Sequence, residues 1–142
     1  MRGQQLPFLI MLIITFVSVG CSARETFPIT EVFDFDAVTF TSLRVVKGNG
    51  TEKSTSDAER ISSILSAVKE CSVMDHKPVD SLPVGFNYML SLFSEDLTMT
   101  VSAAEISIQT VSGREIYDVI RRDQEKLLRA LENLFDSIAR DH

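Results

Sequence analysis

The chain of 142 residues lacks tryptophan and is poor in four other residue types, with two cysteines, two histidines, four prolines and six glycines. Two cysteines in a chain of this length exclude a disulfide-rich scaffold. Acidic residues outnumber basic ones by 20 to 14, and the formal net charge of −6 argues against a nucleic-acid partner held through its phosphates. With 44% hydrophobic residues, the composition is that of one globular domain and not of a disordered chain.

The main apolar run lies near the start of the chain, from Leu6 to Val19, and contains no charged residue. A membrane-spanning helix needs about 20 apolar residues, so this run is short for a span. Its length is typical of the apolar region of an export signal, and Arg2 is the only charged side chain before it. Cys21 follows the small Gly20 directly and precedes a polar stretch.

The segment Val19-Gly20-Cys21 resembles the lipobox of bacterial lipoproteins, although Ser18 stands where that family usually has an aliphatic residue. The resemblance implies that a diacylglycerol is attached to the thiol of Cys21 and that the signal is cut before this residue. We therefore expect residues 1–20 to be a lipoprotein-type signal peptide. Lipid on Cys21 would anchor the protein at the extracytoplasmic face of the cell membrane without a transmembrane helix. An ordinary secreted protein and an uncleaved signal anchor are the alternatives.

The rest of the chain divides into a tether and one domain. Residues 21–35 show no sustained period, and we expect them to hold the lipidated cysteine and the tether. Residues 36–142 have the patterns of a single α+β domain. A strand from Ala37 to Lys47, with a bend near Ser42, leads into Asn49-Gly50, a hairpin signal in which both turn residues would need positive φ, and a second strand should follow.

Two segments have the period of amphipathic helices. The first is expected from Asp57 to Lys69, with Ser56 and Glu59 as an S-x-x-E capping box. The second is expected from Asp123 to Ala139 and has a wide apolar stripe. Between them, Cys71 to Val84 has the pattern of a connection broken by prolines.

Three segments between the helices alternate apolar and polar residues, as half-buried strands do: 86–93, 97–101 and 106–109. Ser112-Gly113 then turns the chain into a fourth expected strand, 114–120. They predict an antiparallel meander. The sequence as a whole predicts an α+β fold, in which an antiparallel sheet of about five to six short strands, a hairpin plus a meander, is packed by two amphipathic helices.

This order of elements is similar to that of small surface lipoproteins of Gram-positive bacteria whose function is uncharacterised. The features that carry the resemblance are the lipobox-like Val19-Gly20-Cys21, the Asn49-Gly50 hairpin before the Ser56-capped helix, and the Tyr88 strand leading through Gly113 to Tyr117 and a terminal helix. The family lends no catalytic residues to this chain.

Few residues suggest chemistry. His76 stands beside Asp75, but the only other histidine is His142, so a solvated loop histidine is favoured over a metal ligand or a base. Asp34 and Asp36 alternate at a strand-like start, and a solvated strand edge is favoured there over a cation site.

The remaining candidates have structural explanations as well. Glu95-Asp96 are turn residues, and no glycine-rich phosphate loop, G-x-S-x-G motif or Ser/His/Asp set is present. If Cys21 is lipidated, Cys71 is either a buried apolar side chain, which is favoured, or an exposed free thiol; without lipid, the two cysteines could form a disulfide. The sequence therefore predicts no catalytic, cofactor-binding or metal-ligating residue.

The expected function is that of a membrane-anchored extracytoplasmic lipoprotein, acting as a non-enzymatic binding or accessory module. Besides the membrane itself, its partner would be an envelope or extracellular protein or a small molecule that the sequence does not identify. The alternative is a secreted or envelope enzyme, or a metal-dependent protein, that uses acidic residues not recognisable from the sequence.

Overall fold

The computed structural model describes residues 24–77 and 87–138. Several features named above lie outside these ranges: the expected signal peptide, Cys21, residues 78–84 of the expected connection with Pro78 and Pro83, the first residue of the expected strand 86–93, Ala139 and His142. Within the described ranges, no helix has both the length and the apolar character needed to cross a membrane.

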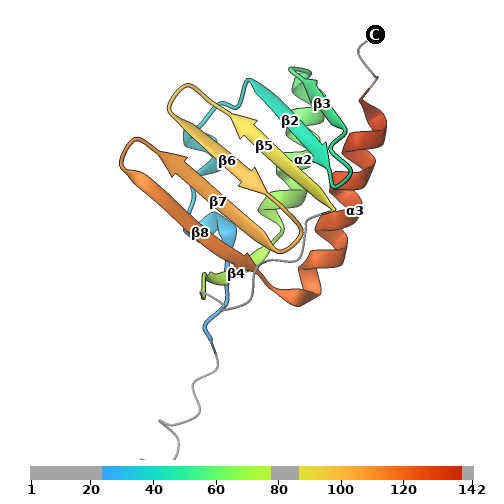
Figure 1. The fold of residues 1–142 in the computed structure, drawn as a ribbon. Coiled ribbons are helices and arrows are strands. Elements are labelled where there is room, and N and C mark those ends of the chain that lie inside the picture. Colours follow the sequence, from blue (N-terminus) through green and yellow to red (C-terminus); the bar gives the residue numbers. More distant parts are fainter. Residues whose placement is uncertain (1–23, 78–86, 139–142) are drawn as a thin grey trace, which may run out of the picture.

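The domain is one antiparallel sheet with two α-helices on one of its faces (Figure 1). The strands are β1 (Phe27–Pro28), β2 (Ser42–Lys47), β3 (Glu52–Thr55), β4 (Ser72–Asp75), β5 (Tyr88–Phe93), β6 (Leu97–Val101), β7 (Glu105–Thr110) and β8 (Gly113–Val119). The helices are α2 (Ala58–Lys69) and α3 (Arg121–Ser137), with two short 3-10 helices, η1 (Ile29–Glu31) and η2 (Phe35–Ala37). The strand order is β1-β4-β8-β7-β6-β5-β2-β3, which confirms the predicted α+β class with an antiparallel sheet and two packed helices.

The predicted number of five to six strands is too low, because β1 and β4 join the sheet from segments without a strand pattern. Strand β4 lies in the segment that the sequence indicates as a broken connection, and it pairs with β8 through Val73 and Val119. Strand β1 pairs with β4 in turn, through Phe27 and Val73. Ile29 follows β1, is fully buried and donates its N–H to the Cys71 carbonyl at 3.0 Å. The folded domain thus includes part of the segment expected to be tether.

The hairpin at Asn49-Gly50 joins β2 and β3, as the sequence predicts, but its turn differs from the predicted one. Gly50 has φ +90°, while no residue other than glycine has positive φ in the described part of the chain, so Asn49 does not have the predicted positive φ. The Gly50 N–H donates to the Lys47 carbonyl at 2.9 Å, and the Lys47 N–H donates to the Thr51 carbonyl at 2.8 Å. This is a three-residue hairpin loop with a left-handed glycine at its last position.

Helix α2 begins one residue later than expected, and its cap is a different residue. The Asp57 carboxylate accepts hydrogen bonds from the N–H groups of Glu59 and Arg60, at 2.8 and 3.2 Å. The predicted Ser56–Glu59 capping box is therefore wrong, and Asp57 is the N-cap. Carboxylates are favoured at this position because the helix N-terminus has unpaired N–H donors and a partial positive charge.

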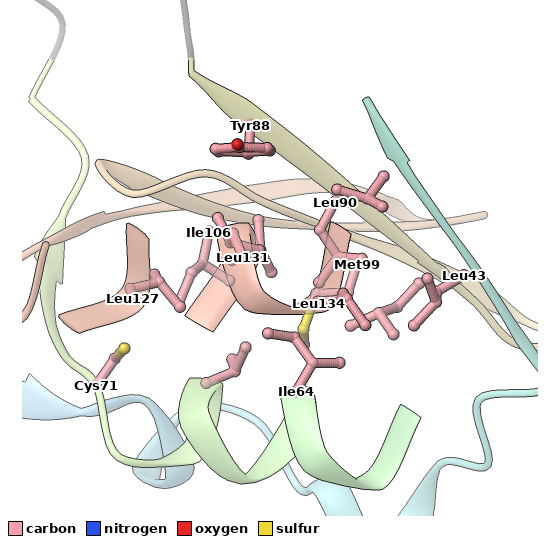
Figure 2. Close-up of a cluster of buried hydrophobic side chains, with 14 of the residues drawn as sticks. Leu43, Ile64, Cys71, Tyr88, Leu90, Met99, Ile106, Leu127, Leu131 and Leu134 are labelled. Carbon is pink, nitrogen blue, oxygen red and sulfur yellow. The ribbon is translucent and has the colours of Figure 1, made fainter. Parts of the chain in front are cut away.

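The core lies between the sheet and the two helices. Figure 2 shows Leu90, Met99 and Ile106 pointing from the sheet toward the helices. Helix α2 contributes Ile61, Ile64 and Val68, and helix α3 contributes Leu127, Leu131, Leu134 and Phe135. These are the apolar stripes that the helical periods predict. The core therefore holds one face of the sheet against the helices and determines which strand residues remain on the other.

Candidate functional site

The face of the sheet opposite the helices carries no described helix (Figure 1). In β5, for example, Tyr88, Leu90 and Leu92 are buried, while the alternate residues remain partly exposed. We call this surface the open face. Its side chains include Arg44, Val46, Met89, Ser91, Phe93, Thr98, Thr100, Ser107, Gln109, Arg114 and Ile116.

The strand register places four hydroxyl side chains together at the centre of the open face. Ser91, Thr100 and Ser107 are successive cross-strand partners on β5, β6 and β7, and Thr98 is two residues from Thr100 on the same face of β6. Each hydroxyl can both donate and accept a hydrogen bond. The centre of this face is therefore polar, in contrast to the apolar face beneath the helices.

Two arginines flank these four hydroxyl side chains. Arg114 Nη2 donates to Ser107 Oγ at 3.4 Å, and Ser107 is buried. On the other side, the Arg44 guanidinium lies 5.8 Å from the centroid of the Phe93 ring. The open face thus offers hydroxyl groups, two guanidinium groups and an aromatic ring to a partner, a combination suited to hydrogen bonding and stacking.

Three side chains with metal-binding atoms meet at one end of the open face. Glu105 is the first residue of β7 and pairs with Asp118 of β8, which pairs in turn with Met74 of β4. His76 lies directly after β4, two residues beyond Met74, and its ring contacts Asp118 on the same side. We call His76, Glu105 and Asp118 the histidine–carboxylate cluster; one ligand atom from each lies within 4.8 Å of the other two.

The cluster is partly exposed and closely spaced. His76 Nδ1 lies 2.7 Å from Asp118 Oδ1 and 4.0 Å from Glu105 Oε2. A carboxylate only accepts hydrogen bonds, so the short contact assigns the Nδ1–H form to the ring. The side chains of His76, Asp118 and Glu105 keep 31%, 24% and 38% of their surface exposed. Solvent and small ions can therefore reach all three.

The second oxygen of Asp118 is engaged by the chain itself. Oδ2 accepts from Arg24 Nη2 and from the Lys77 N–H, each at 3.3 Å, and Arg24 also donates to the Asp75 carbonyl. Burial raises the pKa of Asp118, but the hydrogen bonds from His76, Lys77 and Arg24 outweigh it and hold this pKa below its ordinary value. Asp118 is thus held as a carboxylate with Oδ1 directed to His76.

The other sequence candidates lie elsewhere. Asp34 caps the 3-10 helix η2 by accepting from the Asp36 N–H at 3.1 Å, so the strand edge expected there is wrong, although both residues are exposed as expected. Cys71 is buried, with 3% of its surface exposed, and burial raises the pKa of its thiol to about 11. Glu95-Asp96 lie in the turn between β5 and β6, as predicted.

Sequence reasoning missed Glu105 and Asp118. The local pattern around each residue is that of a half-exposed strand, and the residues are 13 positions apart. Only the register of β7 against β8, and of β8 against the unpredicted β4, places them beside His76.

Comparisons of the chain with protein-family models, with curated proteins and with solved structures find no match.

Proposed function

We propose that the protein is a membrane-anchored extracytoplasmic lipoprotein that acts as a non-enzymatic binding or accessory module and holds its partner at the open face. The observation that carries the proposal is the one-sided packing of the sheet. The helices bury one face, while hydroxyl, guanidinium and aromatic side chains occupy the other.

The composition of the open face favours binding over a purely structural role. The hydroxyl residues Ser91, Thr98 and Thr100 are partly exposed, and Arg44 is exposed. Protein-binding surfaces are enriched in arginine and aromatic residues, and polar groups on such a surface supply direct hydrogen bonds to a partner. A flat sheet face can present these groups together, because strands hold alternate side chains in fixed rows.

The anchor part of the proposal rests on the lipobox-like segment that ends at Cys21 and on the apolar run before it. Two acyl chains hold a protein stably at a bilayer, whereas one chain does so only marginally. A diacylated Cys21 would therefore keep the domain at the membrane, where its partner would be an envelope or extracellular molecule.

The test is photo-crosslinking in intact cells that express the full chain. A benzophenone amino acid replaces Thr98 on the open face in one protein and Ser63 on the exposed side of α2 in the matched control. We expect a discrete crosslinked product from position 98 and none from position 63. Crosslinks of equal yield from both positions, or from position 63 alone, would contradict the open face as the binding surface.

One observation favours the second candidate, a metal-dependent protein or enzyme of the envelope. His76, Glu105 and Asp118 converge at the end of the open face, although the sequence favours a solvated loop histidine at position 76. Hydrolysis of envelope substrates that stops when both carboxylates are neutralised, in Glu105→Gln and Asp118→Asn, would favour the enzyme over the binding module.

A further inference from the structure

We infer that the histidine–carboxylate cluster binds one divalent transition-metal cation of the zinc class, through His76 Nδ1, Asp118 Oδ1 and a Glu105 oxygen. This inference goes beyond the proposed function, because it depends neither on lipid at Cys21 nor on a partner at the open face.

The spacing of the three atoms suits a small cation. Ligand atoms bound to zinc at about 2.0–2.1 Å in a tetrahedral arrangement lie about 3.4 Å apart. The two distances from His76 Nδ1, 2.7 Å to Asp118 and 4.0 Å to Glu105, lie on either side of that value. Small rotations of the partly exposed His76 and Glu105 side chains would equalise them. The strands β7 and β8 meanwhile fix the backbone of both carboxylates.

The charge of the site also favours a cation. Glu105 and Asp118 together carry two negative charges. Arg24 forms an ion pair with Asp118 through Oδ2 and so offsets one of these charges. The remaining negative charge lies on the side where His76 and Glu105 face Asp118. A cation bound at His76 Nδ1 takes the place of the proton that this atom shares with Asp118, and the neutral ring then carries its proton on Nε2.

The partners of Asp118 have the arrangement of an outer shell around a metal ligand. Arg24 and the Lys77 N–H hold Oδ2, which leaves Oδ1 oriented toward the ligand position. Hydrogen bonds of this kind orient the side chains that bind a metal directly, and they contribute to metal affinity.

The donor set identifies the class of metal. Imidazole nitrogen suits zinc and other transition metals, whereas calcium and magnesium prefer a shell of oxygens only. Three protein ligands leave a fourth position of a tetrahedral zinc site to water or to a ligand group. The exposure of all three side chains makes that position accessible from solvent.

The test is isothermal titration calorimetry of the full chain in mild detergent, without a histidine tag. Every protein carries Cys21→Ser, so that a free thiol at position 21 does not compete for metal. We expect one equivalent of Zn²⁺ to bind, no comparable binding of Mg²⁺ or Ca²⁺, and at least tenfold weaker Zn²⁺ binding after His76→Ala.

The chain offers matched controls. His142→Ala removes the only other histidine and should leave Zn²⁺ affinity unchanged, as should neutralising the turn carboxylates in Glu95→Gln with Asp96→Asn. Glu105→Gln leaves the side-chain volume nearly unchanged and should weaken Zn²⁺ binding as His76→Ala does. Thermal unfolding of each variant without metal identifies any that fail to fold, and Glu105→Gln then carries the test in place of His76→Ala.

Cobalt(II) supplies a second readout. Its visible absorption bands are expected to appear at one equivalent in the unchanged chain and to be lost in His76→Ala. The inference is overturned if the protein with the intact cluster binds no Zn²⁺ or binds Ca²⁺ equally well. It is also overturned if folded His76→Ala and Glu105→Gln bind Zn²⁺ as tightly as the protein with the intact cluster. None of these results bears on the photo-crosslinking from position 98, so the two proposals fail separately.

Discussion

Cys71 has the surroundings of a structural thiol. Only 3% of its surface is exposed, its Sγ lies 3.6 Å from the Ala67 carbonyl, and Figure 2 shows it at the margin of the core near Leu127. Burial is the main cause that raises the pKa of this thiol to about 11, and the negative charge of Asp123 adds to it. Because the thiolate is the reactive form, Cys71 should be inert in the folded protein at neutral pH.

The raised pKa of Cys71 predicts a loss of stability in alkali. Below about pH 9 the thiol is protonated in both the folded and the unfolded chain; between about pH 9 and 11 it ionises only in the unfolded chain. The free energy of unfolding should therefore fall as pH rises, by at most about 1.4 kcal/mol per pH unit from this group. Denaturant unfolding from pH 8 to 11 measures this slope. Cys71→Ala should have a shallower slope, and the slope should not vanish because tyrosine and lysine residues also titrate in this range. Equal slopes in the two proteins would contradict a raised pKa of Cys71.

At the level of single residues, burial was predictable and proximity was not. The buried state of Cys71 follows from the apolar character of its side chain. The meeting of His76 with Asp118, 42 positions later, requires a cross-strand register that no local pattern contains. The N-cap shows the same limit on a smaller scale, since Ser56 and Asp57 are both good capping residues and only the backbone geometry selects Asp57.

Asp57→Ala should destabilise the domain by about 1 kcal/mol, because α2 loses the acceptor for two N–H groups of its first turn. Ser56→Ala is the matched control and should leave stability unchanged within about 0.5 kcal/mol, since this exposed residue does not cap the helix. The denaturant midpoints of the two variants show whether Asp57 or Ser56 is the N-cap of α2. A larger loss from Ser56→Ala would restore the capping box that the sequence predicts.

The C-terminal end of α3 is stabilised by residues from other elements. This helix has no basic residue in its last turn. Lys53 Nζ from β3 donates to the Phe135 carbonyl at 2.8 Å, and Arg60 Nη2 from α2 donates to the Ser137 carbonyl at 2.9 Å. Both cations satisfy carbonyls without partners in the helix and complement its negative end. These hydrogen bonds thus hold the end of α3 against the edge strand β3 and against α2.

Leu131→Ala should cost about 2 to 5 kcal/mol, because Leu131 is fully buried between α3 and the sheet and the truncation leaves a cavity. Glu132→Ala, on the exposed side of the same helix, should change stability little. Denaturant unfolding measures both. An amphipathic helix can also lie on a membrane. A midpoint unchanged in Leu131→Ala, together with loss of vesicle binding, would assign α3 to a membrane surface and contradict its place in the core.

Among the elements, long periodic segments were predictable and short ones were not. The hairpin of β2 and β3, the meander of β5 to β8 and both helices follow from period and turn residues. Strand β4 has four residues, of which only Val73 is buried, and β1 has two. Segments this short present no alternation to detect. They are strands because β8 offers an unpaired edge to β4, and β4 then offers one to β1.

For the whole molecule, the position of Arg24 bears on how the domain would sit at a membrane. Arg24 contacts Asp75 and Asp118, so the chain is attached to the domain only three residues after Cys21. Three extended residues reach at most about 11 Å. If Cys21 carries lipid, this end of the sheet, with the histidine–carboxylate cluster, lies close to the headgroups. The tether is then much shorter than the expected segment 21–35, and the partner must be reached near the membrane surface.

The anchor itself predicts the behaviour of the whole protein in cells. In cells supplied with labelled fatty acid, the unchanged protein should incorporate label and partition into detergent, because acyl chains on Cys21 contribute about 0.8 kcal/mol per buried methylene to membrane binding. Cys21→Ser should lose both properties. Cys71→Ala is the matched control, since it removes the other cysteine of the chain and should keep both. Unchanged labelling in Cys21→Ser would show that the label is attached elsewhere and would contradict the lipoprotein proposal. If the unchanged protein stays at the membrane without label, residues 6–19 act as an uncleaved anchor and the lipoprotein proposal is wrong.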